Sequence, residues 1–203
     1  MNRLKFLIFL LLVAMLSACA TTTSLPIAAY SPESTGAPRA ASFNVIVTAT
    51  PMTERRRPSV YNEIQPVQID LQPSFFAVIE QDLTAILAEH LNGSEDGVLI
   101  RATVRDGTVY QLRNPAENLP FVGLATVNRN RLIVANVEIL FEVERNGIVE
   151  NTFPFEHTVE VRGSMATLDL MAESVATAIE ALRDEGWPRI ESEFLERYIE
   201  AAQ

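Results

Sequence analysis

Cysteine, histidine and lysine are scarce in this sequence, and each shortage removes a kind of chemistry. Cys19 is the only cysteine among 203 residues, so no disulfide can form within one chain. His90 and His157 are the only histidines, and without further cysteines they form no cluster of metal ligands. We therefore expect no bound metal and no cofactor.

Positive charge is scarce as well: 16 lysines and arginines stand against 26 acidic residues, and the formal net charge is −10. Nucleic-acid binding uses a basic stripe, and adhesion to anionic membranes uses basic clusters. The composition disfavours both. The one dense basic cluster is Arg55, Arg56 and Arg57. It could hold phosphates, carboxylates or an acidic partner, or it could be a solvated loop.

Motifs of common enzyme classes are also missing. There is no Gly-x-Ser-x-Gly elbow and no glycine-rich loop of Walker or Rossmann spacing. Ser164 beside Gly163 is interpreted as a turn before a helix. A Ser-His-Asp triad assembled in space stays open, but the sequence predicts that the protein is not an enzyme, and a hydrolase is the least favoured function.

The first residues have the layout of a secretory signal. Arg3 and Lys5 give a positive start, and residues 6–16 form an apolar run. That run covers about 11 residues, whereas a helix needs about 20 to cross a membrane. Small residues follow, and the stretch ends in Leu16-Ser17-Ala18-Cys19.

Those last four residues resemble the lipobox of bacterial lipoproteins. The resemblance implies cleavage before Cys19 and a membrane anchor of three acyl chains, beginning with diacylation of the thiol. One acyl chain gives only reversible binding, so three imply firm attachment. Ala20 stands where inner-membrane lipoproteins tend to have Asp. The resemblance therefore implies the outer membrane, with the protein on its periplasmic face.

We expect three regions: residues 1–18 as signal peptide, residues 19–42 as lipidated cysteine and flexible tether, and residues 43–203 as a single periplasmic domain. The tether carries Pro26, Pro32, Gly36 and Pro38 and shows no apolar period. Cleavage would remove Arg3 and Lys5 and take the formal charge from −10 to −12.

Periodicity predicts the elements of the domain. Apolar alternation indicates a strand over residues 43–47, then a short extended piece over residues 67–71. Helical spacing indicates a helix over residues 75–91, closed by Asn92-Gly93. A long strand over residues 98–112 is predicted to contain a bulge at Asp106-Gly107; a hairpin turn there is the alternative.

Residues 132–145 and 148–162 alternate strongly and predict a hairpin. A two-residue turn at Asn146-Gly147 would place Val143 against Glu150, so we expect a three-residue loop beginning at Arg145. This loop predicts pairs of Val143 with Val149, Ile139 with Phe153, and Val137 with Phe155. This register sets Glu142 opposite Glu150 on a solvated face, and His157 opposite Ala135 on the apolar face.

Two helices complete the predicted domain. Thr167 caps the first, which we expect to end near Gly186, and Trp187-Pro188 opens the second. The resulting fold class is α/β (α+β): a two-layer sandwich with a mostly antiparallel four-stranded sheet and helices packed on one face. The predicted order is strand, helix, three strands and two helices. His90 lies near a helix end, where a cation suits the helix dipole.

Together with the lipobox, this order and the run Val159-Glu160-Val161-Arg162-Gly163-Ser164 before the last helices resemble the YajG-type family of bacterial lipoproteins. The general layout is also similar to that of the LptE lipoproteins of lipopolysaccharide assembly. The YajG-type family has no assigned reaction, so the resemblance implies a fold and a location.

We expect a non-catalytic outer-membrane lipoprotein whose tethered domain binds another cell-envelope component. Candidate contacts are an exposed strand edge, the arginine cluster, and the apolar loop of Leu119, Phe121, Val122 and Leu124. That loop could alternatively plug the end of the core. The alternative function is a lipid- or glycolipid-binding carrier with a groove between sheet and helices.

Overall fold

The computed structural model describes residues 23–32, 41–48, 63–67, 69–91, 98–113, 131–164 and 167–195. Its strands are β1 (Thr23–Pro26), β2 (Ser42–Val47), β3 (Glu63–Pro66), β4 (Ile69–Gln72), β5 (Val98–Arg113), β6 (Arg131–Arg145) and β7 (Ile148–Gly163). Its helices are α2 (Phe75–His90), α4 (Leu168–Arg189) and the π-helix η3 (Ile190–Leu195). Among these described residues, no helix is both long and apolar enough to span a membrane.

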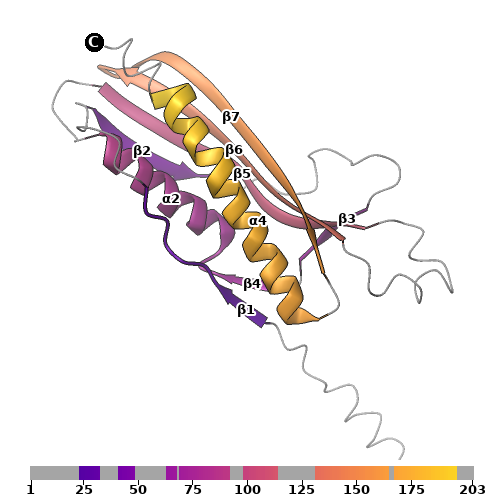
Figure 1. The fold of residues 1–203 in the computed structure, drawn as a ribbon. Coiled ribbons are helices and arrows are strands. Elements are labelled where there is room, and N and C mark those ends of the chain that lie inside the picture. The colour runs from indigo at the N-terminus through magenta and orange to yellow at the C-terminus, as the bar shows by residue number, and fades with distance from the viewer. Residues whose placement is uncertain are drawn as a thin grey trace, which may run out of the picture.

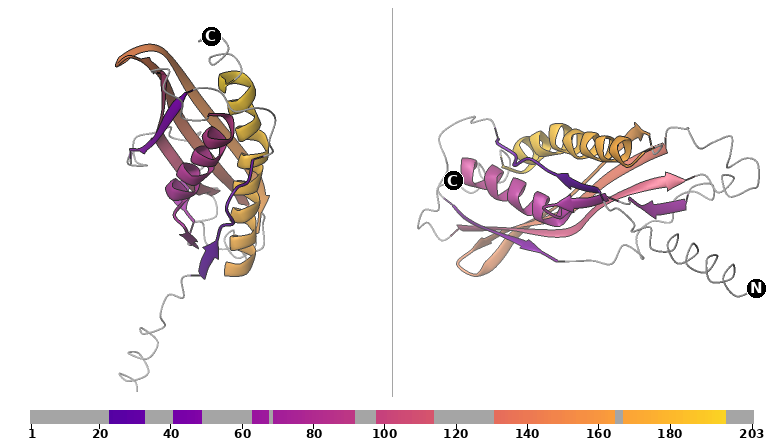
Figure 2. Two further views of the ribbon diagram at one scale, coloured as in Figure 1. Left: turned by 90° about the vertical axis from the view of Figure 1, so that its left-hand side faces the viewer. Right: turned by 90° about the horizontal axis from the view of Figure 1, so that it is seen from below.

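The fold is an α+β sandwich of two layers, as the sequence predicts (Figures 1 and 2). One layer is a five-stranded sheet of order β2-β5-β6-β7, with β3 also paired to β5. Only the β2–β5 pair is parallel in this sheet. Helices α2 and α4 cover the same face of it (Figure 2). The prediction of four strands missed β3, and it missed the separate parallel pair β1–β4.

Side chains fill the space between the sheet and the helices. Each of the packed elements contributes side chains with no exposed surface: Ile139 and Phe141 of β6, Leu83 of α2, Val175 of α4 and Phe194 of η3. The rings of Phe141 and Phe194 stack with centroids 4.3 Å apart. Because burying such a side chain contributes about 1.5–3 kcal/mol, this layer supplies most of the drive to fold.

The long strand β5 contains a bulge, as predicted, but the bulge lies just before Asp106-Gly107. The pairing of β5 with β6 shifts register between Val104 and Asp106. Gly107 then lies directly under α2, because a Cβ there would stand 2.5 Å from Cδ1 of Ile79. The missing side chain therefore allows the close approach of helix to sheet.

The hairpin of β6 and β7 corrects the predicted loop and register. Asn146 and Gly147 form a two-residue turn with φ of 52° and 82°, the type I′ conformation that matches strand twist. Glu144 pairs with Val149, but Val143 pairs with Asn151, so Glu150 is an extra residue in a bulge. The bulge, and not a longer loop, keeps apolar side chains on one face.

As a result, every predicted pair across this hairpin was displaced by two residues. From Phe153 onward each side chain still lies on the predicted face, but Val149, predicted on the apolar face with Val143, lies opposite Glu144. Ile139 pairs with Phe155, and Phe141 with Phe153. His157 lies opposite Val137 and not Ala135. The expected pair of Glu142 with Glu150 does not form, because Glu142 lies opposite Thr152.

The C-terminal helices are continuous, which corrects the predicted break near Gly186. Helix α4 runs through Pro188 to Arg189 and passes directly into η3. Proline has no N–H and its ring crowds the preceding turn. The chain adapts by widening into a π-helix, and the N–H of Ile190 contacts the carbonyls of both Gly186 and Trp187.

Part of the stretch predicted as a flexible tether is packed on the domain. Strand β1 pairs with β4 from Thr23↔Ile69 to Pro26↔Gln72. Leu25, Ile27 and Tyr30 pack against the main core. The apolar residues between the prolines therefore belong to the folded structure, although they show no period along the sequence.

Candidate functional site

Strand β7 forms one edge of the sheet. It ends the strand order, with β6 on one side and no described strand on the other. Pro154 lies within it, and proline is accepted in sheets mainly on edge strands because it lacks an N–H. A strand of 16 residues in this position offers backbone donors and acceptors to another chain.

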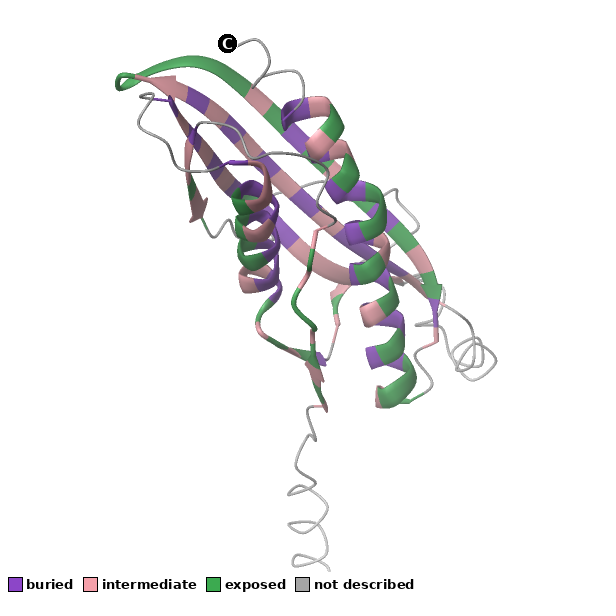
Figure 3. Cartoon of the chain, turned by 60° about the vertical axis from the view of Figure 1, so that its left-hand side comes forward, coloured by how far each residue is buried: buried purple, intermediate pink, exposed green. Residues whose placement is uncertain are grey.

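The start of β7 projects beyond the helices. Its first five residues are all exposed (Figure 3). Ile148 and Val149 are 70% and 43% exposed, and Leu170 is the third large apolar side chain that the described residues expose. We call Ile148, Val149 and the turn Asn146-Gly147 the hairpin tip. Because consecutive strand residues point to opposite faces, the tip exposes one apolar side chain on each side, which suits contact with a partner.

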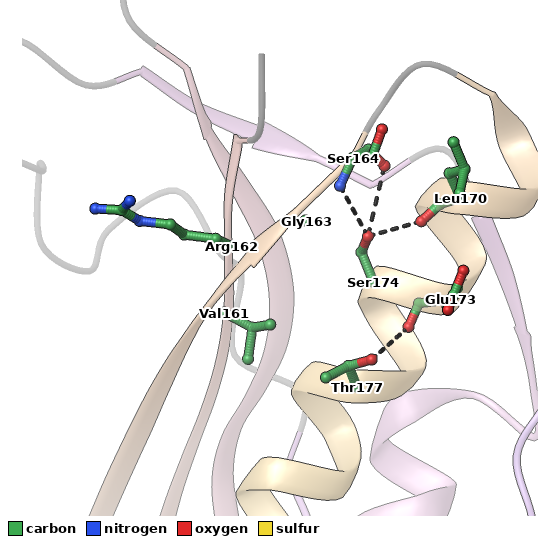
Figure 4. Close-up of a pocket in the computed structure, with 8 residues that line it drawn as sticks. All are labelled: Val161, Arg162, Gly163, Ser164, Leu170, Glu173, Ser174 and Thr177. Carbon is green, nitrogen blue, oxygen red and sulfur yellow. Dashed lines mark hydrogen bonds between the residues drawn. The ribbon is translucent and has the colours of Figure 1, made fainter. Parts of the chain in front are cut away.

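A pocket of about 290 Å³ lies where the other end of β7 meets the start of α4 (Figure 4). The Oγ of Ser174 accepts a hydrogen bond from the Ser164 N–H at 3.0 Å and donates one to the Leu170 carbonyl at 2.7 Å. The side chain of Arg162 points away from α4 (Figure 4). The serine is thus occupied in holding strand to helix. The pocket is lined by Val161, Arg162, Gly163, Ser164, Leu170, Glu173, Ser174 and Thr177.

A buried ion pair joins α2 to α4. Arg183 donates from Nε to Asp82 Oδ2 at 2.8 Å and from Nη2 to Oδ1 at 3.0 Å. The indole of Trp187 donates to the same carboxylate at 3.1 Å. Burial raises the pKa of Asp82, and the hydrogen bonds from Arg183 and Trp187 oppose that rise. Burial disfavours the Arg183 cation, but its bonds to Asp82 outweigh this and raise the pKa of Arg183.

The same arginine also holds the segment after β1. Its Nη2 donates to the carbonyl of Ala28 at 2.9 Å, and its guanidinium lies 5.8 Å from the centre of the Tyr30 ring. Burial raises the pKa of Tyr30, and the charges of Glu191 and Asp82 add to the effect. The tyrosine is therefore a neutral, packed side chain at physiological pH.

Each of the two histidines lies beside a charged side chain. His157 Nδ1 lies 3.0 Å from Nη1 of Arg189, and because a guanidinium only donates, Nδ1 accepts and the ring proton is on Nε2. Burial, followed by the charge of Arg189, lowers the pKa of His157. His90, in the last turn of α2, lies 3.5 Å from a carboxylate oxygen of Glu191.

The residues singled out from the sequence fall mostly outside the described ranges. Cys19, the arginine cluster and the loop of residues 119–124 all lie there, so their roles stay predictions. Within the described ranges, no three acidic, histidine or cysteine side chains gather as metal ligands.

Sequence reasoning missed the Asp82–Arg183 pair, although a signal was present. Asp82 stands within the apolar stripe of its helix, directly before Leu83 and three residues after Ile79. Arg183 follows Leu182 in the same way. A charged residue on an apolar helix face needs a partner of opposite charge, but the sequence does not say which one.

Comparisons with known proteins give only distant likenesses. No protein-family model and no curated protein matches the chain. A Xanthomonas campestris crystal structure of the DUF330 family has a TM-score of 0.48 and 13% identity, covering 85% of this chain and 97% of its own. A candidate lipoprotein from Caulobacter crescentus CB15 has a TM-score of 0.30 and 10% identity, covering 74% and 91%.

With TM-scores below 0.5, neither likeness carries an argument about function. The resemblance to YajG-type and LptE lipoproteins stays a prediction from the sequence. The structure itself defines the class: an α+β domain with an open sheet edge and an apolar hairpin tip.

Proposed function

We propose that this chain is a non-catalytic lipoprotein of the bacterial outer membrane, anchored through Cys19, whose periplasmic domain binds another component of the cell envelope. The observation that carries the proposal is the open edge of β7 together with the exposed Ile148 and Val149 at its start. Backbone groups at a sheet edge recognise an extended segment by strand addition, and adjacent apolar side chains add affinity.

The interior of the domain supports a surface role over a carrier role. The layer between sheet and helices, where a carrier would hold an acyl chain, is occupied by side chains such as Ile79, Leu83 and Trp187 that expose no surface. We assign no catalytic task to His157, because its Nδ1 is engaged by Arg189.

Site-specific photocrosslinking in cells tests the proposal. A photoreactive residue replaces Val149 at the tip, and in a matched variant it replaces Gln81, an exposed residue of α2. We expect an adduct with one envelope protein, identified by mass spectrometry, from the first position only. Adding Ile148→Asp should abolish that adduct, because a charge would enter the apolar contact.

Two results would overturn the proposal. One is the absence of any adduct from Val149, or the same adducts from Gln81. The other is the recovery of stoichiometric lipid with purified Cys19→Ala protein. That variant has no covalent lipid, so bound lipid would show a carrier.

A further inference from the structure

The segment that leads to the anchor is fastened to one end of the domain. Thr23 pairs with Ile69, and the Ile27 N–H donates to the Gln72 carbonyl at 3.0 Å. Leu25 packs against Ile69 and against the first turns of α4. From its first described residue, the chain is therefore part of the folded unit.

Arg183 reinforces this attachment from inside the domain. Its hydrogen bond to the Ala28 carbonyl and its contact with the Tyr30 ring come from a side chain already fixed by Asp82. A segment held by strand pairing, apolar packing and a buried guanidinium does not behave as a flexible linker. The chain between the lipid on Cys19 and the first fastened residue, Thr23, therefore consists of residues 20–22 alone.

That reach is short. The four peptide links from Cys19 to Thr23 span at most about 14 Å when fully extended. The start of β1 and the N-terminal end of α4 lie together at one end of the molecule, and the β6–β7 hairpin reaches to the opposite end (Figures 1 and 3).

We infer that the lipid on Cys19 holds the domain in one orientation, with the β1 end against the phospholipid surface and the hairpin tip directed away from it. This inference rests on the lipid anchor of the proposed function. The membrane-facing end consists of the start of β1, the first turn of α4 with Leu168 and Leu170, and the end of β7 at Arg162. This end contacts the headgroup layer of the membrane in which the lipid on Cys19 is inserted.

Exposed side chains at the membrane-facing end agree with this orientation. Leu170 is 40% exposed on the first turn of α4, where an apolar side chain would meet lipid instead of water. Arg162 is also exposed there and can pair with a lipid phosphate. Asp169 on the same turn and Glu173, which lines the same pocket as Arg162, are acidic neighbours that offset part of this attraction.

The orientation also determines what the tip can contact. Strand β7 has 16 residues, and at about 3.3 Å per residue its path is roughly 50 Å long. A partner bound at Ile148 and Val149 therefore meets the domain well outside the headgroups of the anchoring membrane. The part of the partner that binds is water-exposed.

Fluorescence quenching on vesicles tests the orientation with full-length lipidated protein. Because the lipid occupies the only native cysteine, an introduced cysteine is the single site for a dye. Asp169→Cys marks the membrane-facing end, and Glu150→Cys, also a replaced exposed carboxylate, marks the tip. The vesicles contain phosphatidylethanolamine and phosphatidylglycerol with a nitroxide quencher on the headgroups.

We expect the dye at position 169 to lose most of its emission and the dye at position 150 to lose almost none. Equal quenching at both positions, or stronger quenching at 150, would overturn the orientation. Failure of the protein to float with vesicles would instead contradict the anchor of the proposed function, so the two failures are distinct.

A lengthened linker provides the matched control. Inserting about twelve glycine and serine residues between Cys19 and Thr23 gives a flexible segment of roughly 20 Å mean span in addition to the native links. The variant should still float, but quenching at position 169 should fall clearly. Unchanged quenching at 169 would contradict the claim that the short reach sets the orientation.

Discussion

Arg183 donates two hydrogen bonds to the carboxylate of Asp82, at 2.8 and 3.0 Å, although the two residues are 101 positions apart in the chain. Their side chains are only 4% and 1% exposed. Through Trp187 and the Ala28 carbonyl, the same pair links both helices to the segment after β1. The contact therefore joins the two helices to the N-terminal segment of the described chain.

Removing one member of this pair should destabilise the domain strongly. Arg183→Met leaves the carboxylate of Asp82 buried without its cation, and such losses cost about 3–5 kcal/mol. Urea unfolding followed by circular dichroism measures the change. Arg145→Met, which removes the exposed pair with Glu150, is the control and should cost about 1 kcal/mol or less. Equal losses of unfolding free energy in the two variants would show that the buried pair contributes no more to stability than the exposed pair.

Gly163 should tolerate no side chain, because α4 lies against it. A Cβ at that position would stand 2.3 Å from the Cβ of Ser174. We expect Gly163→Ala to cost about 1–3 kcal/mol by overpacking. Adding Ser174→Gly should relieve the clash, so that the double variant loses less than the sum of the single losses. Strict additivity in the unfolding free energies would contradict the close approach.

Substitutions in the hairpin turn should act through the backbone conformation and not through side-chain clashes. Gly147 has φ of +82°, yet a Cβ there would meet no atom within 4 Å. Gly147→Ala should therefore cost about 1–2 kcal/mol through the left-handed conformation alone. Asn146→Gly should be nearly neutral, because glycine adopts the same conformation freely. A neutral Gly147→Ala in thermal unfolding would argue against the two-residue turn.

His157 should make stability depend on pH. Its pKa is lowered from the ordinary value of 6.5 in the folded state, chiefly by burial. Below about pH 6.5 the unfolded chain takes up a proton that the folded chain resists, so stability falls as the pH decreases through that region. His157→Gln should flatten the decline in unfolding free energy between about pH 7 and 5. An unchanged decline would show that other groups cause it.

The predicted faces of β6, and of β7 from Phe153 onward, were correct because alternation along a strand reports burial directly. The register was wrong because a single extra residue, Glu150, leaves no mark on that alternation. Strand β3 was missed because its four residues are defined by pairing with β5, which is distant in sequence. The Asp82–Arg183 pair likewise depends on how α2 and α4 lie side by side, which no local pattern specifies.

The proposed binding surface could likewise be predicted only in part from the sequence. An exposed strand edge was among the expected contacts, but the sequence did not single out β7, whose edge position follows from the topology. The alternation placed Val149 on the apolar face, but the bulge at Glu150 sets it opposite Glu144, where it is exposed. The arginine cluster and the loop of residues 119–124 stay as predicted contacts outside the described residues.

Intact-mass measurement of the protein purified from the envelope shows directly whether a lipid on Cys19 anchors the domain. We predict a mature chain that begins at Cys19 and carries the added mass of three acyl chains, together with loss of membrane association in Cys19→Ala. A protein that retains residues 1–18, or a Cys19→Ala variant that still fractionates with the outer membrane, would show that Cys19 does not anchor the domain.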